Sequence, residues 1–123
     1  MRLLVCDDSG YARRSLKLAL PQDLGATIEE AVNGAEALVK CRAGGIDLMF
    51  LDLNMPVLDG FGVLTALQAD GIALPIVVVT ANLQSEPAQR AKALGAQEVL
   101  HKPADPATLS RLIRTLLPQH VRA

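Results

Sequence analysis

Five short strand-like runs alternate with five segments of helical length, and this alternation constrains the fold more than any other feature of the chain. The strand-like runs are mostly apolar, as parallel strands covered on both faces are, and they lie at residues 3–6, 27–32, 46–51, 74–79 and 98–101. The predicted helices lie at residues 11–20, 35–43, 60–69, 85–94 and 105–117. Strict alternation predicts an α/β fold of the (βα)5 type, in which helices cover both faces of a doubly wound, five-stranded parallel sheet.

The second strand-like run differs from the others because Glu29 and Glu30 make it polar. A polar strand fits better near the edge of a sheet than in its buried centre. The flavodoxin-like strand order 2-1-3-4-5 places the second strand at the outside, so we expect that order here.

Size and composition fit one domain. The chain has 123 residues, enough to bury a core, and half of them are hydrophobic while only 2% are aromatic. No linker or low-complexity segment divides the sequence, and only residues 118–123 follow the last predicted helix. We therefore expect a single domain over residues 1–123, with no output domain.

Charge and hydrophobic patterning argue against several classes of protein. The net charge is −1 and the pI is near 6.1, so the chain lacks the basic surplus typical of nucleic-acid binding. No apolar run approaches the roughly 20 residues that a membrane helix needs. Cys6 and Cys41 are too few for a disulfide framework, and we expect buried, reduced thiols in a cytoplasmic protein. We expect neither nucleic-acid nor membrane partners.

Polar residues with chemical potential follow four of the five predicted strands. They are Asp7 and Asp8 after the first strand, Asp52 after the third, Thr80 after the fourth and Lys102 after the fifth. Ligands of open parallel sheets bind beyond the carboxyl ends of the strands, where these five side chains should meet. Each residue type also has an ordinary role, as a turn or cap aspartate, a strand threonine or a solvated loop lysine. Their joint occurrence at one sheet edge favours a functional site.

This set of side chains predicts metal-assisted phosphoryl chemistry. Three converging carboxylates repel one another, and a hard divalent cation relieves that repulsion. Mg²⁺ is the expected ion, and Mn²⁺ could substitute for it. A lysine ammonium and a threonine hydroxyl can hold further oxygens of a phosphoryl group. Asp52 is the candidate nucleophile, which would form an acyl phosphate, because it is central and has partners on both sides.

Four segments of the chain resemble those of a known family, the receiver domains of two-component response regulators. Residues 4–8 resemble the acidic pair after the first strand, and residues 52–56, followed by 59–60, resemble the phosphoacceptor segment. Residues 79–81 resemble the switch threonine with its small neighbour, and residues 101–103 resemble the lysine segment. The resemblance covers nearly the whole chain and is highly specific in its order and spacing. The family has the fold derived above.

The resemblance implies how the acidic residues would act. Asp52 would take a phosphoryl group from a phosphohistidine on a sensor histidine kinase or a histidine phosphotransfer protein. Asp8 and Asp52 would bind Mg²⁺ directly, together with the backbone carbonyl of Asn54. Asp7 would act largely through water.

The resemblance also implies roles for the other strand-end residues. Lys102 would pair with the phosphoryl group, and Thr80, followed by the small residue Ala81, would swing towards it. In this family a proline such as Pro103 commonly follows the lysine through a cis peptide bond, so we expect a cis bond between Lys102 and Pro103.

Two features of the sequence bear on how a signal would leave the site. The family often carries an aromatic switch residue three positions before the lysine, and here that residue is Val99. A valine has few rotamers, so we expect weaker coupling to the outer face of the last strands, or coupling through backbone shifts. At the rim, Asn54 and Asn82 stand two positions beyond Asp52 and Thr80, where the family tunes the lifetime of the acyl phosphate.

The expected function is that of a stand-alone signalling switch rather than an enzyme acting on other substrates. Phosphorylation would shift a two-state equilibrium and change the binding of a downstream effector through the surface of residues 85–117. The receiver could bind an effector, as chemotaxis receivers bind the flagellar motor, or it could act as a relay or phosphate sink. We expect a monomer or a weak dimer.

Two other functions fit parts of the pattern. Phosphatases of the haloacid dehalogenase type also use an aspartate nucleophile and Mg²⁺, but they need an acid two positions past it, where this chain has Asn54. The chain is also short for their usual cap. A degenerate receiver would bind partners without phosphorylation, and the intact set of Asp52, Thr80 and Lys102 argues against it.

Three further residues, Tyr11, His101 and His120, are not expected to take part in the chemistry of the site. We expect Tyr11 to be a partly buried helix residue, with stacking at a partner interface as the alternative. We expect His101 and His120 to be neither phosphodonors nor metal ligands, since an isolated histidine beside a strand end is usually packed or solvated.

Overall fold

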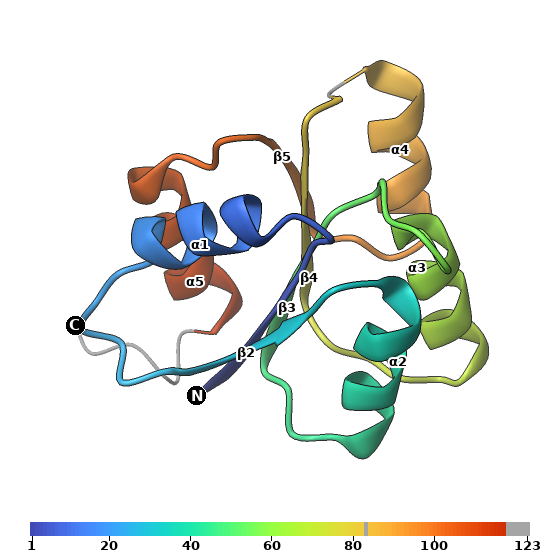
Figure 1. Ribbon diagram of the computed structural model, residues 1–123, viewed down its shortest axis with the longest axis horizontal. Helices are drawn as coiled ribbons and strands as arrows, with labels where there is room; N and C mark the ends of the chain where they lie inside the picture. Colours follow the sequence, from blue (N-terminus) through green and yellow to red (C-terminus); the bar gives the residue numbers. More distant parts are fainter. Residues whose placement is uncertain (83, 118–123) are drawn as a thin grey trace.

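The computed structural model describes residues 1–82 and 84–117, whose strands form one five-stranded sheet with helices on both sides (Figure 1). The strands are β1 Arg2–Cys6, β2 Thr27–Ala31, β3 Leu48–Leu51, β4 Ile76–Thr80 and β5 Glu98–His101. The helices are α1 Gly10–Ala19, α2 Gly34–Ala43, α3 Gly60–Ala69, α4 Ser85–Ala93 and α5 Pro106–Leu116. All neighbouring strands are parallel, in the order β2-β1-β3-β4-β5. The predicted (βα)5 fold and its flavodoxin-like order are confirmed.

Each face of the sheet has its own helices and its own core. α1 and α5 lie on one face, and α2, α3 and α4 lie on the other (Figure 1). The side chains of β3 alternate between the two cores: Leu48 and Phe50 belong to one, and Met49 and Leu51 to the other. Because the central strands are buried on both faces, their sequences are continuously apolar.

β2 lies at the edge of the sheet, as its two glutamates predicted. Glu29 forms an ion pair with Arg2, and Glu30 forms one with Arg13. Charged side chains are tolerated at this position because an edge strand lets them reach solvent.

Two strands begin later than the sequence predicts. The strand predicted from residue 46 pairs only from Leu48, and the Asp47 carboxylate accepts the Arg2 N–H at 2.7 Å in place of a strand carbonyl. The strand predicted from residue 74 pairs only from Ile76, because Pro75 has no N–H to donate to a ladder. Each helix boundary agrees with its prediction to within one residue.

The prediction that Tyr11 is partly buried is wrong. Its side chain is on α1, and the residue is 84% exposed. Leu16 is the buried residue of α1 and marks the face that packs on the sheet. Tyr11 lies about 140° around α1 from Leu16, so its ring does not pack on the sheet and lies exposed at the edge of the pocket that Leu16 also lines.

Both cysteines are buried and unpaired, as predicted. Burial raises the pKa of the Cys6 thiol to about 12 and that of Cys41 to about 11. These thiols therefore remain protonated and serve as packing groups.

Residues 118–123, which include His120, lie outside the described residues. In the part of the chain that the structure describes, no helix has the length and apolar character needed to cross a bilayer.

Candidate functional site

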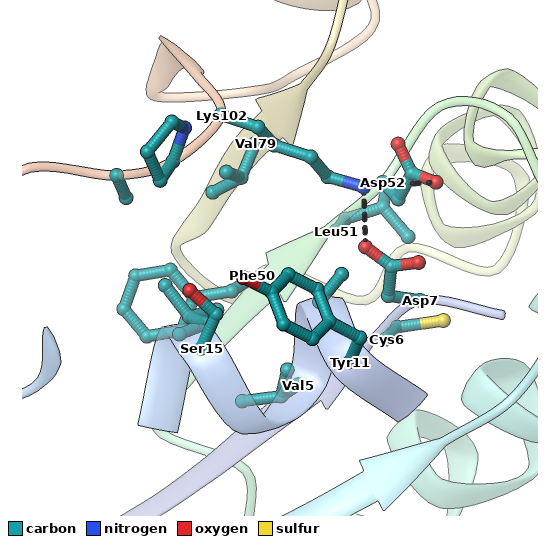
Figure 2. Close-up of a pocket in the computed structure, with 14 residues that line it drawn as sticks. Val5, Cys6, Asp7, Tyr11, Ser15, Phe50, Leu51, Asp52, Val79 and Lys102 are labelled. Carbon is teal, nitrogen blue, oxygen red and sulfur yellow. Dashed lines mark ion pairs between the residues drawn. The ribbon is translucent and has the colours of Figure 1, made fainter. Parts of the chain in front are cut away.

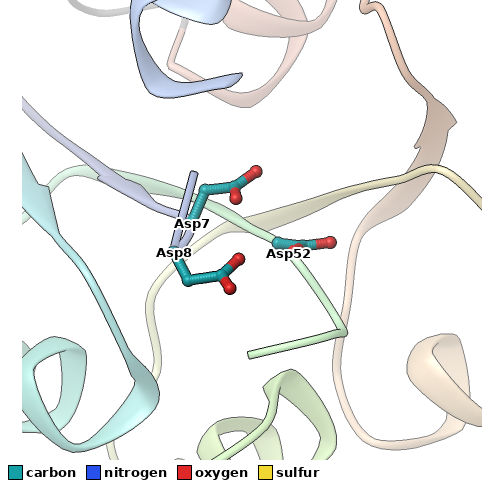
Figure 3. A group of neighbouring side chains, drawn as sticks. All are labelled: Asp7, Asp8 and Asp52. Carbon is teal, nitrogen blue, oxygen red and sulfur yellow. The ribbon is translucent and has the colours of Figure 1, made fainter. Parts of the chain in front are cut away.

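Three carboxylates meet at the carboxyl end of the sheet (Figure 3). Asp7 and Asp8 follow β1 and Asp52 follows β3, and oxygens from all three lie within 4.8 Å of one another. Asp7 and Asp52 are each only 5% exposed, whereas Asp8 is exposed. The carboxylate group, as we call these three residues, is therefore enclosed by protein on one side and open to solvent at Asp8.

The ends of β1 and β3 hold the two buried aspartates in place. The Asp52 N–H donates to the Cys6 carbonyl at 3.0 Å, and the Asp7 N–H donates to the Ala31 carbonyl at 3.1 Å. These bonds continue the sheet ladder past the last residue of each strand. The Ser9 N–H donates to Asp7 Oδ1 at 2.9 Å, which also fixes the orientation of that side chain.

Lys102 brings a positive charge to the carboxylate group. Its Nζ lies 2.6 Å from Asp7 Oδ2 and 3.6 Å from Asp52 Oδ2 (Figure 2). Its backbone N–H donates to the Thr80 carbonyl at 2.9 Å, which ties the loop after β5 to the end of β4. The peptide bond between Lys102 and Pro103 is cis, so that prediction is confirmed. The ammonium neutralises Asp7 more fully than it neutralises Asp52.

The electrostatics of Asp52 favour an additional cation. Burial raises the pKa of the Asp52 carboxyl above its ordinary value, and the neighbouring Asp7 carboxylate raises it further. The Lys102 ammonium and the backbone N–H groups of Asn54 and Leu53 lower this pKa, but they do not cancel the rise. The carboxylate oxygens of the group are the donors that Mg²⁺ and Mn²⁺ prefer, so the residues present fit such an ion.

Thr80 is the last residue of β4 and is buried, with 1% of its surface exposed. Its hydroxyl oxygen accepts the Asn82 N–H at 3.2 Å. Ala81 and Asn82 are exposed, as is Asn54 in the loop after β3. The backbone end of β4 is thus buried, while the residues that follow it are accessible to a partner.

Val99 lies within β5, opposite Val78 of β4. It is half-buried and packs against the core on the α2, α3 and α4 face. Val99 is therefore a packing residue, and no ring stands at this position to change its exposure.

Arg13 positions the site, and no pattern in the sequence singled it out. Its Nη1 donates to the Asp7 carbonyl at 2.8 Å, and its Nε donates to the Glu30 carboxylate at 2.8 Å. Hydrogen bonds from Lys17 and Arg13 hold the pKa of Glu30 below its usual value. The only signal was a basic residue shortly after the acidic pair, and its pairing with β2 became visible only in the fold.

Gly60 allows α3 to begin directly behind Asp52. A Cβ at this position would collide with the Asp52 carbonyl oxygen and with Leu53 Cα. The Gly60 N–H donates to the Leu53 carbonyl at 3.0 Å, and the Asp59 carboxylate caps α3 by accepting the Gly62 N–H at 2.8 Å. The loop that leaves Asp52 is therefore held against the start of α3.

A family comparison matches residues 3–114 to the family described as the response regulator receiver domain. The chain belongs to this family. The receiver domain is a signalling switch of two-component systems rather than an enzyme domain in its own right. The match includes all the strand-end residues described above.

Curated relatives carry a similar segment within longer proteins. The chain is 42% identical over 110 residues to protein-glutamate methylesterase/protein-glutamine glutaminase 5 of Myxococcus xanthus, covering 88% of this chain and 32% of that protein. It is 37% identical over 116 residues to the transcriptional regulatory protein PrrA of Mycobacterium tuberculosis, covering 94% of this chain and 49% of PrrA. The chain thus spans a third to a half of these relatives.

Solved receiver structures have the same fold. The chemotaxis protein CheY4 of Vibrio cholerae superposes with a TM-score of 0.82 at 34% identity, covering 94% of this chain and 98% of that one. The receiver domain of Francisella response regulator 1452 gives a TM-score of 0.86 at 25% identity, with 98% of each chain covered. The chain therefore resembles a chemotaxis receiver in sequence as well as in fold.

Proposed function

We propose that this receiver domain is a phosphoacceptor switch of a two-component phosphorelay and that Asp52 is the residue phosphorylated. The observation that carries the proposal is the position of Lys102 Nζ, 2.6 Å from Asp7 and 3.6 Å from Asp52, beside three converging carboxylates. Phosphoryl transfer depends on a positioned nucleophile and on charge stabilisation around the phosphoryl oxygens. Asp52 supplies the nucleophile, and its neighbours supply the charge and the hydrogen bonds.

Asp8, Asp52 and the backbone carbonyl of Asn54 would hold Mg²⁺, with Mn²⁺ as a substitute. A divalent ion bound here neutralises charge on phosphoryl oxygens. The proposed indirect role of Asp7, through water, is supported by its contacts. Its Oδ2 pairs with Lys102 and its Oδ1 accepts the Ser9 N–H, so both oxygens already have partners.

In the proposed reaction, a carboxylate oxygen of Asp52 attacks the phosphorus of a phosphohistidine. A P–O bond forms as the P–N bond breaks, and the imidazole leaves with the electron pair and takes up a proton. Lys102 then moves from Asp7 towards the new phosphoryl oxygens. The Thr80 hydroxyl, which accepts the Asn82 N–H before the reaction, turns to donate to another of these oxygens.

The proposed phosphodonor is a sensor histidine kinase or a histidine phosphotransfer protein. A downstream effector would bind the surface formed by α4, β5 and α5, which covers residues 85–117. We place this receiver domain in the cytoplasm, as a monomer or weak dimer without nucleic-acid or membrane partners. The free, buried cysteines are consistent with a reducing compartment.

An aspartyl-nucleophile phosphatase is less well supported by the same site. The position of its general acid is taken by Asn54, whose exposed amide cannot give or take a proton at neutral pH. A relay or phosphate sink uses the same chemistry as the switch and differs only in where the phosphoryl group goes next.

The proposal is tested with beryllofluoride, a mimic of an aspartyl phosphate. With Mg²⁺ present, we expect amide resonances of Thr80, Lys102 and α4 to shift in the wild type and to stay in place in Asp52→Asn. Chelation of the Mg²⁺ should abolish the response. The matched control is Asp23→Asn, an exposed aspartate in the loop between α1 and β2, which should respond like the wild type.

A wild type without any response, or an Asp52→Asn variant that responds equally, would show that Asp52 is not the phosphoacceptor. A pull-down with and without beryllofluoride then separates two pathways. Capture of a protein that is stronger with beryllofluoride indicates an effector. Capture of a histidine-containing phosphotransfer protein indicates a relay, in which the phosphoryl group can return to a histidine.

A further inference from the structure

A cavity of about 270 Å³ lies beside the carboxylate group, on the sheet face that α1 and α5 cover (Figure 2). Its floor is apolar and consists of Val5, Phe50 and Val79 from the central strands and Leu16 from α1. The loop after β5 forms another part of its wall. The body of this cavity therefore suits an apolar group.

One end of the cavity is charged. Asp7, Asp52 and Lys102 line that end, so two carboxylates face one ammonium. Lys102 Nζ lies 2.6 Å from Asp7 but 3.6 Å from Asp52. Asp8 adds a third carboxylate within 4.8 Å of the other two. The charged end is therefore negative overall, and Asp52 is the carboxylate that Lys102 neutralises less.

Tyr11 stands at the mouth of this cavity. Its side chain lines the cavity although the residue is 84% exposed, and Figure 2 places its ring at the front. Phe50, which is 1% exposed, lies on the floor. Because Phe50 is almost completely covered, the Tyr11 ring is the aromatic surface open to a planar group in the cavity, and aromatic contacts add to the free energy of simple burial.

We propose that this cavity binds a single-ring aromatic amine in its ammonium form, with the ring against Tyr11 and the apolar lining and the ammonium beside Asp52. The cavity is slightly smaller than the roughly 300–1,000 Å³ of pockets for drug-sized molecules, so one ring with a short chain is the right size. The positive head complements the negative end, and the ring complements the apolar floor. A negatively charged aromatic ligand complements only the apolar floor. A cation without a ring complements only the negative end.

Such a ligand would compete with a divalent cation. Its ammonium and the cation would neutralise the same Asp52 carboxylate, and two positive charges at this distance repel each other. The amine would therefore inhibit the phosphorylation proposed above. Its binding, however, does not depend on whether Asp52 is phosphorylated.

Benzylamine is a suitable probe, because it is an ammonium ion at neutral pH and carries one ring. We expect a titration of the metal-free protein to shift the amide resonances of Phe50, Val79 and Ala104 saturably. The emission of Tyr11 should change as well, and this signal is unambiguous because the chain has one tyrosine and no tryptophan. Phenylacetate, with the opposite charge, and methylammonium, without a ring, should give no saturable shift. Added Mg²⁺ should raise the apparent Kd of benzylammonium.

Two variants of α1 test the location. Ser15→Phe places a ring in the cavity, which Ser15 lines, and should weaken benzylammonium binding by at least about tenfold. Leu18→Phe introduces the same side chain on the same helix at a position that is 70% exposed and outside the cavity, so binding should be unchanged. If Ser15→Phe does not fold, Tyr11→Ala replaces it. That variant removes the ring at the mouth and should also weaken binding, measured by amide shifts alone.

The inference is wrong if phenylacetate binds as tightly as benzylammonium, if Leu18→Phe weakens binding as much as Ser15→Phe, or if no shift saturates. The beryllofluoride experiment tests the proposed function independently of this inference. Benzylammonium binding without a beryllofluoride response would contradict only the proposed function, and the reverse result would contradict only this inference.

Discussion

α3 and α4 cover the same face of the sheet but are held to the protein in different ways (Figure 1). α3 is buried through four residues, which are Gly60, Val63, Leu64 and Leu67. Asp59 also caps its first turn. α4 buries only Ala91, and its N-cap residue Gln84 makes no side-chain capping bond. Arg90 of α4 instead lies over the Phe61 ring of α3, 4.1 Å from its centroid.

Because of this difference, α3 is suited to hold the site in place, whereas α4 is suited to shift when the site changes. α3 begins directly behind Asp52, so its burial keeps the loop after Asp52 in place. α4 follows Thr80 through a short loop, and a helix with few buried apolar contacts can shift at a small free-energy cost. We interpret α4 as the responsive element in this chain, even though Val99 replaces the usual aromatic residue.

The largest effect is expected from truncating the core of α3. Leu64 is 1% exposed, and Leu64→Ala should lower the free energy of unfolding by about 2–5 kcal/mol. In α4 the corresponding change, Ala91→Gly, should cost about 1 kcal/mol through helix propensity. Chemical denaturation of both variants measures the difference. Equal losses would mean that the two helices are held equally well.

The next effect concerns the capping of α3. Asp59→Ala removes the acceptor of the Gly62 N–H and should destabilise the protein by about 1 kcal/mol. The matched control is Gln84→Ala at the equivalent position of α4, where no side-chain capping bond exists to be lost. Thermal unfolding compares the two. A control that loses as much stability as Asp59→Ala would contradict the comparison.

The difference in stability between α3 and α4 should become smaller if α4 gains the side-chain cap that it lacks. Gln84→Asp supplies a carboxylate acceptor and a negative charge at the helix N-terminus, which should stabilise α4 by roughly 0.5–1 kcal/mol. We expect slower amide hydrogen exchange in α4 and unchanged exchange in α3. Exchange that slows equally in both helices would indicate a global effect and would argue against independent motion of α4.

The smallest effect is expected at the contact between the two helices. Arg90→Gln removes the cation over Phe61, an exposed interaction worth about 0.5 kcal/mol. Phe61→Leu and the double variant complete a cycle that isolates this term. Arg111→Gln, at an exposed arginine on α5, is the control. A coupling of zero would leave Ala91 as the main attachment of α4.

Much of the fold could be predicted because it depends on local patterns. Short apolar runs and helical periodicity located every element, and the polar Glu29 and Glu30 indicated the edge strand correctly. The errors in the strand boundaries have local causes too. The Asp47 carboxylate, rather than a backbone carbonyl, accepts the Arg2 N–H, and Pro75 has no N–H to donate to the neighbouring strand. The Tyr11 prediction is wrong because this residue lies about 140° around α1 from the buried Leu16.

The strand ends by themselves determined which side chains would stand at one edge, since parallel strands bring their carboxyl ends together. Asp7, Asp52 and Lys102 could be chosen on that ground, and the family resemblance gave them roles. Only the tertiary structure decided how they share charge, with Lys102 nearer to Asp7 than to Asp52. It also decided that Arg13 holds the Asp7 backbone and that a cavity lies below Tyr11. Such features depend on distances between segments remote in the chain, and those distances are set by packing rather than by any local pattern.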